Sequence, residues 1–125
     1  PDMSIGSMRF NGMWDDEKFN ELNKNPILNA WERCQGFWTY LHIKDAATAC
    51  RMAVEKPKWK GHEKFFLNAK DTMITIETME AIKIVYPDVE LREEIAGHNA
   101  PLKIDLAKEK FDWEPKFSWR DSIFG

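Results

Sequence analysis

The stretch that decides the fold class is Phe37-Trp38-Thr39-Tyr40-Leu41-His42-Ile43, followed by Lys44 and Asp45 and then by Ala46-Ala47-Thr48-Ala49-Cys50-Arg51-Met52-Ala53-Val54. Aromatic and β-branched residues dominate positions 37–43, which is typical of a β-strand. Asp45 is expected to cap a helix over residues 46–54, and Pro57 is expected to end it. Because residues 46–54 are small or apolar around most of the helix circumference, we expect this helix to pack closely on a sheet and to be covered on its other side too.

Outside this stretch, strand and helix patterns continue to alternate along the chain. Strands are predicted over residues 4–10 and 62–68, and an extended segment over residues 89–95. Helices are predicted from Asp15 to Asn25, with Phe19 and Leu22 on one face, and over residues 27–33, 75–86 and 105–111, with Thr75 and Asp105 as caps. Ser118 to Asp121 has the form of a capping box that opens a last turn. Strands that alternate with helices predict an α/β class.

Length and charge restrict the classes of function. The 125 residues suit one domain or a piece of a larger one. A net charge of -3 gives no electrostatic reason to expect a nucleic-acid or membrane partner. No apolar run approaches the roughly 20 residues that span a bilayer. Cys34 and Cys50 show no paired spacing, which favours a reducing compartment, so we expect a cytoplasmic protein.

The sequence lacks the common catalytic and cofactor motifs. Its six glycines never cluster into a phosphate-binding loop, and its three histidines are not at metal-ligand spacing. Tyr40 and Lys44 have the spacing of a catalytic Tyr/Lys pair that requires a helix. In a strand these residues would lie some ~13 Å apart, too far to couple. We therefore predict no catalytic, cofactor-binding or metal-binding residue in this chain.

Several segments, in a consistent order, resemble one enzyme family. Residues 38–49 are similar to a conserved segment of the NAD-dependent epimerase/dehydratase family, the extended short-chain dehydrogenases/reductases, and residues 65–69 look like the strand that follows it. Asp105-Leu106-Ala107-Lys108, followed by Phe111-Asp112-Trp113-Glu114-Pro115, is close to the family's C-terminal motif, and Phe117 to Asp121 continues it. Residues 4–10 look like the strand after the catalytic helix. The resemblance covers nearly the whole chain and is weakest over residues 11–35.

The resemblance implies a C-terminal, substrate-binding portion over residues 1–125. It would consist of a small substrate-binding lobe plus edge strands of a Rossmann-like, doubly wound sheet. In the family, the Gly-rich loop and the Tyr/Lys pair come earlier in the chain. A missing N-terminal Rossmann half would therefore bind the NAD or NADP of the full-length parent, and no cofactor is expected on this chain alone. The implied function is the substrate-binding portion of an NAD(P)-dependent epimerase/dehydratase-like oxidoreductase, acting on a small molecule such as a sugar or sugar nucleotide.

Five residues are candidates to face that substrate: Asn11, Trp14, Trp38, His42 and Arg92. Many family members have Arg where Trp38 stands and Asn where Gly12 stands. Trp cannot replace a guanidinium on a phosphate, so these departures favour a branch with a different substrate. For Trp38 the alternative is core packing, and for Arg92 it is a surface charge.

Two other interpretations remain open. The chain could be a non-catalytic ligand-binding module derived from the same family. It could also be a protein-interaction module, because a sheet without its other half would expose apolar surface. That second interpretation predicts a homo-oligomer through the strand at residues 4–10 or the helix at residues 46–54.

Overall fold

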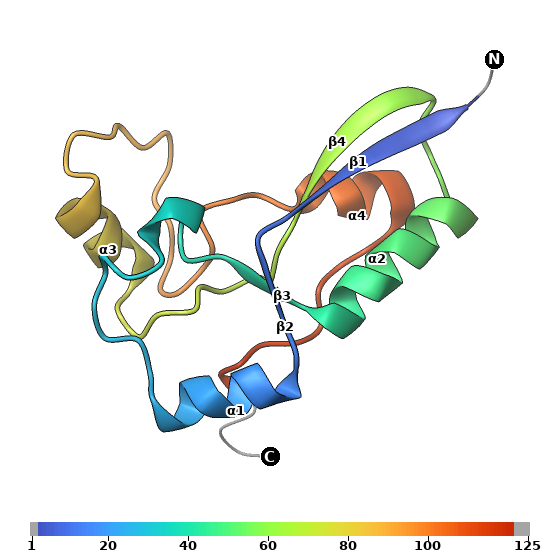
Figure 1. Ribbon diagram of the computed structural model, residues 1–125. Helices are drawn as coiled ribbons and strands as arrows, with labels where there is room; N and C mark the ends of the chain where they lie inside the picture. Colours follow the sequence, from blue (N-terminus) through green and yellow to red (C-terminus); the bar gives the residue numbers. More distant parts are fainter. Residues whose placement is uncertain (1–2, 122–125) are drawn as a thin grey trace.

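The computed structural model describes residues 3–121, which form a small mixed α/β domain with two short parallel β-pairs and four α-helices (Figure 1). The elements follow in the order β1 (Ser4–Phe10), β2 (Gly12–Trp14), α1 (Asp16–Lys24), β3 (Tyr40–His42), α2 (Ile43–Glu55), β4 (Gly61–Leu67), α3 (Thr78–Val85) and α4 (Asp105–Phe111). No helix within residues 3–121 is both long and apolar enough to cross a bilayer.

The larger β-pair joins β1 and β4 in parallel, in a register that runs from Ser4 opposite Gly61 to Phe10 opposite Leu67. Side chains from its inner face, including Phe65 and Leu67, form one apolar core with side chains of α2 and with Phe111 of α4. The outer face is open: Ile5 is 51% exposed and Phe66 is 43% exposed. Alternation along both strands therefore gives this pair one packed face and one bare face.

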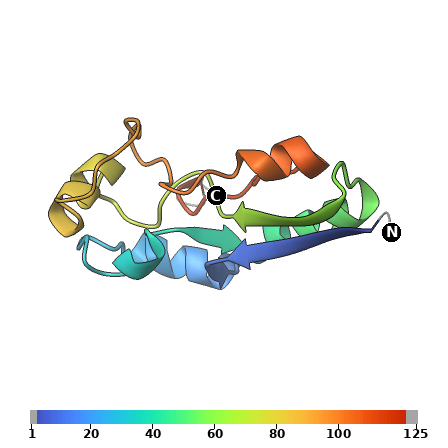
Figure 2. The same ribbon diagram turned by 90° about the horizontal axis from the view of Figure 1, so that it is seen from above.

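A second core surrounds the other β-pair, in which β2 runs parallel to β3. Its buried residues come from α1, α3 and the connecting segments, and they include Trp14, Phe19, Trp38, Tyr40 and Trp119. Seen from above in Figure 2, α3 and the β1–β4 pair lie toward opposite ends of an elongated molecule. The two cores thus define a sheet lobe and a helical lobe, which β3 and the C-terminal segment connect.

The helix after β3 begins earlier than expected. His42, and not Asp45, is the N-cap of α2: its ring Nδ1 accepts a hydrogen bond from the Lys44 amide at 3.0 Å. Asp45 lies within the first turn, where its carboxylate contacts a distant segment. The expectation that α2 is covered on both sides is also wrong, since Cys50 is exposed and Val54 is 83% exposed.

Other sequence-based boundaries also differ from the structure. Residues 27–33 are not a helix; Ile27 instead forms a parallel bridge with Ile74, and a 3₁₀ turn follows at Cys34–Gly36. The strand predicted over residues 37–43 shrinks to β3 because Phe37 and Trp38 adopt left-handed φ angles of 54° and 58°. Residues 89–95 form no strand. The helix predicted from Thr75 begins at Thr78, and Ile104 rather than Asp105 occupies the cap position of α4.

Candidate functional site

Three of the five predicted substrate residues lie in the core of the helical lobe. Trp14 stacks on Tyr40 with ring centroids 5.0 Å apart. Trp38 is fully buried, and its indole Nε1 donates to the Ala30 carbonyl at 2.7 Å. Because each ring already has its partners, neither presents a free face to a ligand in this conformation. For Trp38 this arrangement favours the core-packing alternative.

His42 is buried, and its side chain contacts several parts of the molecule. Besides capping α2, its Nε2 lies 2.8 Å from Oδ1 of Asp16 at the start of α1. Its ring stacks on Phe117, with centroids 4.6 Å apart, and contacts Phe19 edge-on. The hydrogen bond from His42 lowers the pKa of Asp16 below its usual value. His42 is thus a junction between β3, α1, α2 and the C-terminal segment.

The other two predicted residues are exposed and lie in different places. Asn11 donates through Nδ2 to the Thr39 hydroxyl and, more weakly, to the Gly36 carbonyl at 3.5 Å. Arg92 lines a surface depression formed by residues 91–96, 99–101 and 103, which includes none of the other four candidates. The structure therefore brings Trp14 and His42 to one cluster around Phe19 and Tyr40, and it leaves Arg92 apart.

A polar cluster fixes the C-terminal segment to β3. The Tyr40 hydroxyl donates to Asp71 at 2.6 Å, and the Ser118 hydroxyl donates to the other oxygen of Asp71 at 2.6 Å. The Arg120 guanidinium pairs with the same carboxylate. Burial, with the adjacent Asp71 charge, raises the pKa of Tyr40. A tyrosine that abstracts a proton needs a lowered pKa, so this environment also argues against a catalytic Tyr40–Lys44 pair.

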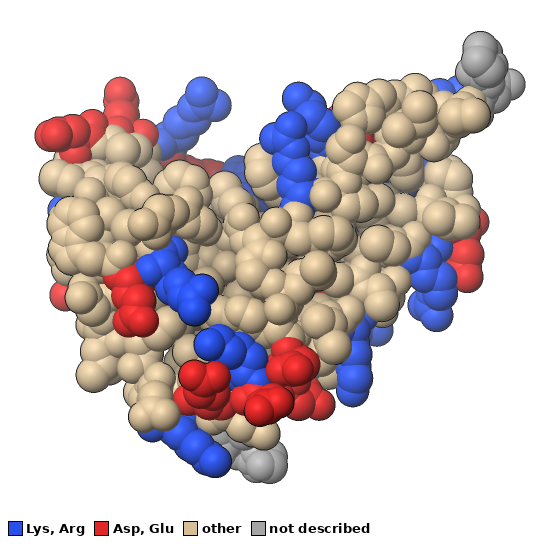
Figure 3. Space-filling model, in the orientation of Figure 1, with Lys and Arg blue, Asp and Glu red and all other residues tan. Residues whose placement is uncertain are grey.

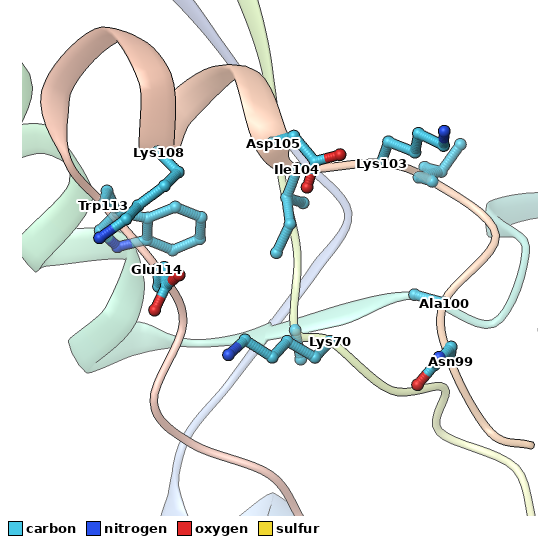
Figure 4. Close-up of a pocket in the computed structure, with 11 residues that line it drawn as sticks. Lys70, Asn99, Ala100, Lys103, Ile104, Asp105, Lys108, Trp113 and Glu114 are labelled. Carbon is cyan, nitrogen blue, oxygen red and sulfur yellow. The ribbon is translucent and has the colours of Figure 1, made fainter. Parts of the chain in front are cut away.

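A cleft that no sequence motif indicates lies between the end of β4 and the start of α4 (Figure 4). The cleft has a volume of about 370 Å³, within the range of small-molecule sites. It is lined by Ala69, Lys70, Asn99, Ala100, Leu102, Lys103, Ile104, Asp105, Lys108, Trp113 and Glu114. These residues come from three separate segments, so no local spacing in the sequence could have identified them as a group.

Charged side chains surround this cleft unevenly. The Lys108 ammonium lies 2.9 Å from Asp112, and the Lys103 ammonium pairs with Glu93. Each of these ion pairs raises the pKa of its lysine and lowers the pKa of its acid, and both acids lie outside the cleft lining. Lys70 makes no side-chain hydrogen bond or ion pair with any residue in the range 3–121. The cleft can therefore offer one unpaired cation beside an apolar wall.

Within residues 3–121, no group of three or more His, Cys, Asp or Glu side chains is placed to hold a metal ion. Compared with known proteins, the chain matches no protein-family model, no curated protein and no solved structure.

Proposed function

We propose that this chain is the substrate-binding portion of an NAD(P)-dependent epimerase/dehydratase-like oxidoreductase. The observation that carries the proposal is the parallel pairing of β1 with β4, which has α2 and α4 on one face and no other helix or strand of residues 3–121 on the opposite face. Residues 11–60, which include α2, connect the two strands. This is the connection that parallel neighbours in an α/β sheet require.

Parallel sheets are stable when both faces are covered and several strands lie side by side. Each strand of the β1–β4 pair has one partner strand within residues 3–121, and Ile5 and Phe66 face outward on the bare side. A cofactor-binding half with a Rossmann-like sheet would complete the β1–β4 pair and cover this face. That half would supply the Gly-rich loop, the Tyr/Lys pair and the NAD or NADP site.

In this proposal the helical lobe and the cleft beside it form the substrate side. The substrate is a small molecule, with a sugar or sugar derivative as the first class to test. The polar cluster around Asp71 and the cap at His42 keep the C-terminal segment in place along β3. These residues position the lobe, and the reacting groups belong to the other half.

The test is to purify the native polypeptide that contains this sequence, measure its intact mass, and titrate it with NAD and NADP by calorimetry. The 125-residue chain serves as the matched control. We expect a longer native protein that binds one of the two dinucleotides and a 125-residue chain that binds neither. Micromolar NAD affinity in the 125-residue chain would contradict the proposal, as would a native protein that binds neither dinucleotide.

A specific observation also favours a protein-interaction module. Ile5 and Phe66 are exposed on the bare face of the β1–β4 pair, where the Arg9 guanidinium lies over the Phe66 ring; Figure 3 shows Lys and Arg side chains at one end of the pair and uncharged surface over the rest. Such a patch promotes association. If this second function holds, the 125-residue chain forms a concentration-dependent oligomer in sedimentation velocity. A monomer at every concentration would count against it.

A further inference from the structure

The cleft between the end of β4 and α4 combines three kinds of group that recognise a particular ligand. In Figure 4, the Lys70 side chain lies along the lower side of the cleft with its ammonium end toward Glu114. The buried Trp113 indole backs one wall, and its Nε1 donates to the Asp45 carbonyl at 3.1 Å, which fixes the ring. Asp105 and Glu114 place carboxylates in the lining.

We propose that this cleft binds a small organic phosphate that also carries hydroxyl groups, with Lys70 contacting the phosphoryl oxygens. The proposal assigns a ligand and a location to the substrate side, and to that extent it rests on the proposed function. None of the five residues expected from the sequence to face a substrate lines this cleft.

Of the three lysines in the lining, Lys70 is the one that pairs with no acid among residues 3–121. Lys103 and Lys108 are held by Glu93 and Asp112, which lie outside the lining. An ammonium without a carboxylate partner can form a charge-assisted hydrogen bond to a phosphoryl oxygen without first breaking an ion pair.

The carboxylates explain why a bare anion is a poorer ligand than a phosphate with hydroxyls. Carboxylates repel an anion placed next to them but accept hydrogen bonds from hydroxyl groups. Asp105 and Glu114 can therefore bind the polar body of the ligand, while the half-buried side chains of Leu102 and Ile104 contact its apolar edge. The Asn99 amide adds a donor and an acceptor.

The test is a titration of the ¹⁵N-labelled 125-residue chain, followed by NMR, with four probes: glucose 6-phosphate, inorganic phosphate, gluconate and glucose. Glucose 6-phosphate should shift the amide signals of Lys70, Ala100 and Glu114 and the indole signal of Trp113. We expect it to bind more tightly than inorganic phosphate or glucose. Binding by gluconate equal to that by glucose 6-phosphate would overturn the assignment of a phosphoryl group.

Two matched variants locate the anion contact. Lys70→Met should weaken binding of glucose 6-phosphate by roughly tenfold or more, because a charge-assisted hydrogen bond is lost. Lys83→Met removes an exposed lysine from the last turn of α3, outside the cleft, and should leave the affinity unchanged. Unchanged signals away from the cleft show that each variant is folded. Equal affinity in Lys70→Met and the wild type would overturn the proposal.

The outcomes separate this inference from the proposed function. Lys70-dependent binding of glucose 6-phosphate, together with a native protein that binds no dinucleotide, would support the cleft and refute the oxidoreductase. A native protein that binds NAD or NADP, with no response of the cleft to any probe, would support the oxidoreductase and refute the ligand proposed for the cleft.

Discussion

Trp38 combines a left-handed backbone with complete burial. Its φ of 58° is unusual for a bulky residue, and such a conformation costs about 1–2 kcal/mol. The tertiary structure therefore has to hold it in place. The indole hydrogen bond to Ala30 and an edge-on contact with Tyr86, with ring centroids 6.2 Å apart, do so.

Replacing Trp38 by Phe should lower the free energy of unfolding by about 1–3 kcal/mol, since it leaves a void and a buried carbonyl without its donor. Urea unfolding followed by circular dichroism measures the change. The matched control is Trp31→Phe, because Trp31 is 58% exposed and the same substitution there should change stability by less than about 0.5 kcal/mol. If the two variants are equally stable, packing of the Trp38 indole does not contribute to the free energy of unfolding.

Residue-level inference from the sequence succeeded where partners are local. The expected helix face of Phe19 and Leu22 is confirmed, because spacing alone places both on one side of α1, where they are buried. The cap role of Asp45 was wrong because its hydrogen-bond partners lie more than 70 positions away, at Lys116 and Phe117. For the same reason the lysines of the cleft could not be grouped from their spacing.

At the scale of elements, the first turn of α2 anchors the C-terminal segment. Both carboxylate oxygens of Asp45 accept from the Lys116 amide at 3.0 Å, and one of them also accepts from the Phe117 amide at 3.0 Å. The carboxylate also lies in the first turn of α2, where a negative charge is favourable. Asp45 therefore stabilises the helix and the docked segment at once.

Asp45→Asn should cost about 2 kcal/mol of unfolding free energy, because charge-assisted hydrogen bonds are lost and a side-chain amide now faces backbone donors. Hydrogen exchange should show faster exchange at Lys116 and Phe117, and urea unfolding gives the total. Asp88→Asn, at an exposed aspartate after α3, is the control and should change neither. Unaltered protection of the two amides in Asp45→Asn would show that the segment is held by its other contacts.

Element prediction succeeded for regular patterns and failed where distant contacts set the backbone. The strand at residues 4–10 is confirmed, and the strand at residues 62–68 is shifted by one residue at each end. Residues 27–33 have helix-compatible composition, yet Ile27 pairs with Ile74, and the Thr75 hydroxyl and amide both donate to the Ile27 carbonyl. Pairing between distant segments overrode local propensity there.

For the whole molecule, the prediction of an α/β class is confirmed, and two apolar cores divide the structure into a sheet lobe and a helical lobe. No helix or strand of residues 3–121 covers the bare face of the β1–β4 pair. Its alternation pattern was visible in the sequence, but the absence of a covering layer depends on where every other element packs.

Phe66→Glu tests whether this bare face drives self-association of the isolated chain. Arg9 lies opposite Phe66 in the register, and its guanidinium is 5.5 Å from the ring centroid, so the new carboxylate gains a cross-strand cation and the fold should be kept. A charge on an exposed sheet face opposes association with another apolar surface. We expect sedimentation velocity to show less oligomer at high concentration than the wild type shows.

Leu28→Glu is the matched control, because Leu28 is 71% exposed and lies outside the β1–β4 pair. It introduces the same charge and removes a similar apolar area, so it should leave association unchanged if the bare face is responsible. If both variants reduce association equally, added charge alone explains the effect. If neither does, the bare face makes no contact between copies of the isolated chain, and the protein-interaction function loses its support.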